Sequence, residues 1–202
     1  MNLYYTPTSP FARWVVVTIL ECHLPKPNLV VADPWVFPKA LVESNPFSTV
    51  PALTTDDNET IVESLLIVQY LFRASASKSN KTKMSHELPL LGYAKLLLET
   101  AFRNVSLANH HPDHKTSHPF IARTQTMLTQ ALEKLPQYLP KTPLFNHPAH
   151  LHLAVALDYL SFRKPMLADQ FLDEAARVFL SPFLERESFT KTSPKNFGTL
   201  LL

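Results

Sequence analysis

Strand signals in this chain are confined to the first 62 of its 202 residues, which limits the folds that it can adopt. Short apolar runs bounded by turn residues predict strands there, and runs with a helical period separate them. In chain order we expect a strand at 2–5, a helix at 10–22, a strand at 28–32, a helix at 38–44, a hairpin at 51–62 and a helix at 63–73. This βαβ-α-ββα order predicts a small α/β domain with helices covering a sheet.

The rest of the chain shows helical patterns only. A stretch rich in Ser, Lys and Asn interrupts the apolar pattern and predicts a linker. Beyond it, residues 151–160 are apolar nearly all round, which is typical of a buried central helix. Residues 172–189 predict a last helix, bent at Pro182. We therefore expect an α/β domain at 1–74, the linker at 75–86 and an all-α helical bundle at 87–202.

The composition excludes several classes of protein. Hydrophobic residues make up 46% of the chain and charged residues 18%, which is typical of a globular protein. Lys and Arg number 19 against 17 Asp and Glu, so the chain lacks the basic excess of a nucleic-acid-binding protein. Its apolar stretches are too short to span a bilayer, no signal-peptide pattern precedes the first strand, and Cys22 is the only cysteine. These features predict a cytoplasmic protein that binds neither nucleic acid nor membrane.

Three short motifs fall at predicted element boundaries of the α/β domain. Ser9-Pro10 is expected to cap and begin the first helix, Val50-Pro51 precedes the hairpin, and Glu63-Ser64 begins the third helix. The longer segments around them resemble motifs of the glutathione S-transferase superfamily, and two C-terminal segments resemble its small bacterial members. The matching segments are Ser9-Pro10-Phe11-Ala12-Arg13, Asn45-Pro46-Phe47-Ser48-Thr49-Val50-Pro51-Ala52-Leu53, Ile61-Val62-Glu63-Ser64-Leu65-Leu66-Ile67, Asp158-Tyr159-Leu160-Ser161-Phe162-Arg163 and Arg186-Glu187-Ser188-Phe189. The resemblance implies a thioredoxin-like glutathione-binding domain followed by an all-helical domain.

The resemblance also implies an enzyme, a glutathione transferase. Such an enzyme activates the thiol of glutathione, its co-substrate, for attack on a small apolar electrophile. Ser9 is the expected catalytic residue, because a hydroxyl at a helix N-terminus stabilises a thiolate. Thr8 and Tyr5 are rival hydroxyls for this role. A cysteine at the position of Ser9 would indicate thiol–disulfide exchange instead, and this turn contains none.

The same resemblance implies a set of glutathione-binding residues. Val50 presents its backbone to the tripeptide at a cis-proline bend, Ser64 holds the γ-glutamyl carboxylate, and Glu63 meets the amino group. The chain departs from the family where Ser48-Thr49 replaces Gly-Lys, which removes a cation for the glycyl carboxylate. Lys39 and Arg13 are the cations considered in its place. The full set is Phe11, Lys39, Val50, Pro51, Glu63 and Ser64.

Two groups of histidines stand outside this pattern. The first group comprises His110, His111, Asp113, His114 and His118. These are metal-ligand types, but Pro112 opposes a helix that would align them, so we interpret the segment as a solvated loop and expect no metal. The second is His147-Pro148-Ala149-His150, which replaces the Ser/Thr-x-x-Asp capping box that begins the family's buried helix. This replacement predicts pH-sensitive folding, because histidine changes charge near neutral pH.

Members of the family are usually homodimers, so the resemblance implies a homodimer in which the third helix of one subunit meets the helical domain of the other. It also leaves an alternative function open, namely a non-catalytic protein of the same fold that binds glutathione or another protein. The presence of Ser9, Pro51 and Glu63-Ser64 favours the enzyme. The missing Gly-Lys pair favours the alternative.

Overall fold

The computed structural model describes residues 1–75, 87–110 and 118–197, which group into two compact units. Unit 1 comprises Met1–His86, Phe145–Pro148 and Leu184–Leu202, and unit 2 comprises Glu87–Leu144 and Ala149–Phe183. Of the predicted linker, residues 76–86 lie outside the described residues. Among the described helices, none combines the length and the apolar content that crossing a membrane requires.

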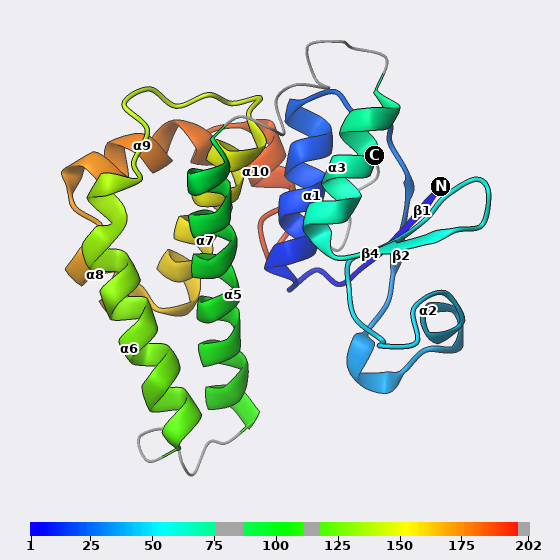
Figure 1. Ribbon diagram of the computed structural model, residues 1–202, viewed down its shortest axis with the longest axis horizontal. Helices are drawn as coiled ribbons and strands as arrows, with labels where there is room; N and C mark the ends of the chain where they lie inside the picture. Colours follow the sequence, from blue (N-terminus) through cyan, green and yellow to red (C-terminus); the bar gives the residue numbers. More distant parts are fainter. Residues whose placement is uncertain (76–86, 111–117, 198–202) are drawn as a thin grey trace. The chain divides into compact units, whose positions relative to one another are not determined.

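Unit 1 is built on a four-stranded mixed sheet with the strand order β2-β1-β3-β4 (Figure 1). β1 runs parallel to β2 and antiparallel to β3, and β3 runs antiparallel to β4. The first elements of the chain are β1 (Asn2–Tyr5), α1 (Pro10–Glu21), β2 (Asn28–Val31), the 3₁₀-helix η1 (Pro34–Val36), α2 (Lys39–Ser44), β3 (Ala52–Thr54), β4 (Thr60–Val62) and α3 (Ser64–Ala74). This order confirms the α/β domain with the predicted βαβ-α-ββα arrangement.

Different helices cover the two faces of this sheet, with α1 and α3 side by side on one face and α2 on the other (Figure 1). Tyr4, Ala52 and Val62 share the α2 face, where they pack with Leu41. Because successive side chains of a strand point to opposite faces, Tyr5 points toward α1 and α3. Helices therefore cover both faces at the central strands β1 and β3, where Leu3, Tyr5, Ala52 and Leu53 are buried, and this burial fixes the strand register.

The end of the chain completes unit 1. The helix α10 (Glu187–Lys191) packs against α1. At the end of α1, the carboxylate of Glu21 forms an ion pair with the guanidinium of Arg186, with N–O distances of 2.6 and 2.8 Å. It also accepts a hydrogen bond from the hydroxyl of Ser188. A bidentate Arg–carboxylate pair of this kind is both strong and directional. It fixes the last turn of α1 against the C-terminal segment.

Unit 2 is all-α in its described residues. Its elements are α5 (Leu88–His110), α6 (Pro119–Lys134), the 3₁₀-helix η3 (Leu135–Gln137), α7 (Pro148–Arg163, in this unit from Ala149), α8 (Pro165–Phe171) and α9 (Glu174–Leu184, in this unit to Phe183). α5 and α6 lie along each other (Figure 1). All side chains from Leu151 to Leu157 are fully buried, which confirms that α7 is a central helix.

The single helix expected at 172–189 was wrong. α9 ends at Leu184 and α10 begins at Glu187. Arg186 between them has an extended backbone, with φ −75° and ψ 144°. The ion pair between Arg186 and Glu21 explains the break, because the side chain bonds to a residue 165 positions earlier in the chain. Pro182 lies inside α9 and does not end it.

Candidate functional site

One edge of the sheet gathers three of the predicted motifs. The final pairs of the sheet join three residues in one row, Tyr4 of β1, Ala52 of β3 and Val62 of β4. Because β3 is antiparallel to both neighbours, the ends of β1 and β4 and the start of β3 lie at the same edge. The turn at Ser9 follows β1, Val50-Pro51 precedes β3, and Glu63-Ser64 follows β4. The topology thus brings residues about fifty positions apart to one edge of unit 1.

Ser9 is the N-cap of α1, as predicted. Its Oγ accepts the backbone N–H of Ala12 at 3.2 Å, and Pro10 occupies the first helical position. The residue is 6% exposed. A hydroxyl that accepts a hydrogen bond keeps its own proton for donation to another group. The Ser9 hydroxyl therefore lies at the positive end of α1 with a proton to give.

The two rival hydroxyls have different surroundings. Thr8 is exposed. Tyr5 is 1% exposed, and its hydroxyl donates to the carbonyl of Phe197 at 3.1 Å. The rings of Tyr5 and Phe197 also pack with their centroids 4.8 Å apart. Burial raises the pKa of the Tyr5 phenol. Because these contacts hold the Tyr5 hydroxyl against the C-terminal segment, we favour Ser9 over Tyr5.

The bend before β3 has the expected backbone. The Val50–Pro51 peptide bond is cis. Pro51 is buried, and Val50 is half-buried against the cluster of Leu41 and Ala52 on the α2 face. Phe11, another expected binding residue, is half-buried in the first turn of α1.

The start of α3 combines an unusual backbone with a buried hydroxyl. Glu63 has φ 72°, in the left-handed region, and its side chain makes no capping hydrogen bond to the helix. A non-glycine residue there costs about 1–2 kcal/mol. Such a residue persists only where its surroundings fix it. Ser64 is the first helical residue and is 5% exposed. The first backbone N–H groups of a helix have no partner within it and can hold an anion.

Asn45, to which the sequence alone assigned no role, holds the altered Ser48-Thr49 segment. Asn45 is fully buried, and its Nδ2 donates to both the carbonyl and the Oγ1 of Thr49 at 2.9 Å. Ser48 has φ 48°, a value that favours glycine, and its hydroxyl donates to the carbonyl of Pro34 at 2.9 Å. Side-chain hydrogen bonds therefore stabilise a turn that lacks its glycine. The Asn-Pro pair at 45–46 is a turn signal that could have identified Asn45.

The two cations considered for the glycyl carboxylate lie in contrasting places. The Nζ of Lys39, in α2, is 3.6 Å from the carboxylate of Glu43, and their side chains are 88% and 65% exposed. Such a pair contributes little stability and leaves the lysine able to change partner. The guanidinium of Arg13 is buried, donates to Thr192 Oγ1 at 3.3 Å and lies over the ring of Phe189. Arg13 therefore binds the C-terminal segment, whereas the ammonium of Lys39 lies at the surface.

The first histidine group is described only at its ends, because residues 111–117 lie outside the described residues. The Nδ1 of His110 lies 2.8 Å from the carbonyl of Ser106. The Nδ1 of His118 accepts the backbone N–H of Phe120 at 3.3 Å and so caps α6. Each of these two histidines thus contacts the end of its own helix.

Comparison with known proteins finds a family match for the first part of the chain. Residues 3–79 match the family described as glutathione S-transferase, N-terminal domain. The match contains all three motifs at the sheet edge. A search among curated proteins finds no match.

Solved structures extend the likeness to nearly the whole chain. A glutathione S-transferase from Methylobacillus flagellatus, with glutathione bound, is 21% identical over 96% of this chain and 98% of its own, with a TM-score of 0.78. Gtt2 from Saccharomyces cerevisiae is 18% identical over 95% and 100%, with a TM-score of 0.73. A Pseudomonas fluorescens family member with bound S-(propanoic acid)-glutathione is 21% identical over 96% and 99%, with a TM-score of 0.70. The chain thus has the glutathione S-transferase fold, with a thioredoxin-like first domain and a helical remainder.

We expect Tyr5→Phe to lower the free energy of unfolding by about 1–3 kcal/mol, because it leaves the buried carbonyl of Phe197 without its donor. Urea unfolding followed by circular dichroism measures this change. Tyr4→Phe is the matched control on the opposite face, since the Tyr4 hydroxyl makes no hydrogen bond within the described residues, and it should leave the midpoint unchanged. Equal midpoints for Tyr5→Phe and wild type would contradict the assigned contact.

Proposed function

We propose that this protein is a glutathione transferase that activates the thiol of glutathione for attack on a small apolar electrophile. One observation carries the proposal: the row of Tyr4, Ala52 and Val62 brings the Ser9 turn, the cis bend and the start of α3 to one sheet edge. The family of residues 3–79 supports it, as does the glutathione bound to the Methylobacillus flagellatus protein.

The proposed binding mode uses the backbone of unit 1. Val50 pairs with the peptide backbone of glutathione as a further strand would. Ser64 binds the γ-glutamyl carboxylate through its hydroxyl and N–H, at the positive end of α3. The exposed carboxylate of Glu63 meets the γ-glutamyl amino group. Phe11 and Pro51 line the same edge, and Lys39 takes the glycyl carboxylate in place of the missing family lysine.

A hydrogen bond from Ser9, together with the helix N-terminus, is strong enough to lower the pKa of the glutathione thiol as the proposal requires. A thiol with a pKa of about 8.5 is about 3% ionised at pH 7, and lowering that pKa by about two units requires about 2.7 kcal/mol. A hydrogen bond to a charged group contributes about 1.5–3 kcal/mol. The helix N-terminus adds about 0.3–1 kcal/mol. A hydroxyl donated by Ser9 at the start of α1 therefore accounts for a bound thiolate, and the thiolate is the nucleophile.

The class of the second substrate follows from what a thiolate attacks. The ligand of the Pseudomonas fluorescens protein, S-(propanoic acid)-glutathione, is a thioether of glutathione. A thioether is the product when a glutathione thiolate attacks a carbon electrophile. This supports conjugation as the reaction class. A cytoplasmic location fits a chain whose only cysteine, Cys22, is a buried thiol.

A non-catalytic glutathione-binding or protein-interaction role is the alternative. The observation that favours it is the Ser48-Thr49 segment, where hydrogen bonds from Asn45 replace the family's glycine and no lysine follows. This alternative retains glutathione binding and lacks turnover. Steady-state kinetics therefore separates it from the enzyme.

We expect Ser9→Ala to lower kcat/KM for glutathione with chlorodinitrobenzene by about 10- to 100-fold, because the thiolate loses one charge-assisted hydrogen bond. The pKa of the bound thiol, followed by thiolate absorbance, should rise in parallel. Thr8→Ala and Tyr5→Phe are the controls and should keep both values. Loss of activity in Thr8→Ala alone would assign the role to Thr8. Glutathione binding by a wild type that turns over none of a panel of electrophiles would support the non-catalytic alternative.

We also propose a homodimer. Leu66 of α3 and Leu96 of α5 remain 50% and 63% exposed, and large apolar side chains at such sites favour burial in an interface. We expect sedimentation equilibrium to give twice the 22.9 kDa mass of one chain. Leu66→Glu should give the mass of one chain, and Val178→Glu, at an apolar site in α9 that is 65% exposed, should not. A single-chain mass for the wild type at micromolar concentration would rule out the dimer.

A further inference from the structure

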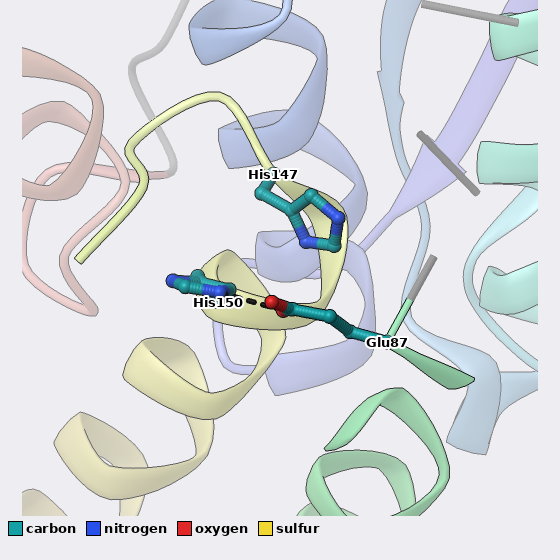
Figure 2. A group of neighbouring side chains, drawn as sticks. All are labelled: Glu87, His147 and His150. Atoms are coloured by element: carbon teal, nitrogen blue, oxygen red, sulfur yellow. Dashed lines mark hydrogen bonds and ion pairs between the residues drawn. The ribbon is translucent and has the colours of Figure 1, made fainter. Parts of the chain in front are cut away.

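His150 forms hydrogen bonds with two segments of unit 2 that are far apart in the sequence, one at Leu144 and one at Glu87. It lies in the first turn of α7, and its side chain is 1% exposed. Its Nδ1 accepts the backbone N–H of Leu144 at 3.0 Å. Its Nε2 lies 2.7 Å from the carboxylate of Glu87, just before α5 (Figure 2). The ring of Phe179 in α9 is 6.2 Å away, centroid to centroid.

These contacts fix the protonation state of the imidazole. A neutral imidazole has one N–H and one lone pair. Since Nδ1 accepts from Leu144, the proton resides on Nε2 and is donated to Glu87. Both ring nitrogens are thus in use, and a metal ion at Nε2 would displace the proton that Glu87 accepts. His150, held in place by Glu87, therefore anchors the segment before α7 through its hydrogen bond with Leu144.

The anchor depends on the protonation state of a histidine, whereas the family has an aspartate at this position. In the Ser/Thr-x-x-Asp capping box, a carboxylate accepts a backbone N–H and keeps doing so well below neutral pH. His150 stands at the position of that Asp. A histidine accepts at Nδ1 only while it is neutral, because an imidazolium has two N–H groups and no lone pair.

We propose that His150 is a pH-dependent positioning residue, which anchors the chain at Leu144 when neutral and releases it when protonated. Protonation would set an Nδ1–H against the N–H of Leu144, so that bond is lost. The bond to Glu87 becomes an ion pair at the same time. The released part is therefore the segment that leads into α7, while the start of α5 remains attached.

The charges around His150 set the direction of the response. Desolvation lowers the pKa of His150, and the carboxylate of Glu87, just before α5, opposes this shift. On its own element, desolvation by full burial, and then the charge of Lys95 of α5, lower the pKa of His152 to about 3, so His152 stays neutral in mild acid. His147, three residues before His150, is buried too, and Phe179 carries no charge. Because the folded protein binds fewer protons than the unfolded chain, stability is full above a pH of about 6.5 and falls as the pH decreases.

Amide exchange measured by NMR at a series of pH values tests the proposal. We expect the protection factor of the Leu144 amide, which is corrected for the intrinsic rate, to fall about tenfold between about pH 7.5 and about pH 4.5, as loss of one hydrogen bond predicts. Its midpoint should coincide with the titration of the His150 ring protons. A Leu144 protection factor that does not change with pH would overturn the proposal.

Two variants and one control separate this response from general acid effects. In His150→Asn, Oδ1 accepts from Leu144 without titrating, so the pH dependence at Leu144 should disappear. In Glu87→Gln, loss of the carboxylate should move the midpoint to lower pH, which decides the question if His150→Asn does not fold. His118→Asn, the same substitution at the cap of α6, should leave the Leu144 response unchanged. An unchanged midpoint in Glu87→Gln, or a pH response retained in His150→Asn, would overturn the proposal.

Discussion

The pairing of β3 between β1 and β4 is the constraint on which the site depends. Both pairings are antiparallel, and both include Ala52. A slip of one residue in either pairing would move every side chain of that strand to the other face and shift one loop away from the edge. Tyr4, Ala52 and Val62 resist such a slip because they pack with Leu41 of α2. Packing on the α2 face thus positions the turns that the proposed chemistry uses.

Side chains bond to the backbone at helix starts in both units. In unit 1, the hydroxyl of Ser9 caps α1 and the carboxylate of Asp33 caps η1. In unit 2, His118 caps α6 and the carboxylate of Asp173 accepts the N–H of Ala176 at the start of α9, while His150 anchors the approach to α7. The glutathione-binding residues proposed here all belong to unit 1.

Local sequence patterns predicted the elements whose causes are local. The Ser9 cap and the hairpin depend on neighbours within a few residues, α7 was predicted from its own apolar composition, and the structure confirms all three. The break at Arg186 and the hydrogen bond from Tyr5 to Phe197 were missed, because the partners are 165 and 192 positions away. The role of Asn45 was missed although its partner Thr49 is only four residues away, because the Asn-Pro turn signal was not used. The family resemblance supplied the roles of the site residues, which no spacing alone could give.

The most direct measurement is a titration of the 15N-labelled protein with glutathione, followed by amide chemical shifts. The account predicts saturable binding in which the largest shifts fall together at Ser9, Val50 and Glu63-Ser64, with small shifts in the rest of unit 1. Shifts confined to another surface, or none at millimolar glutathione, would contradict the claim that one edge of the sheet binds the tripeptide.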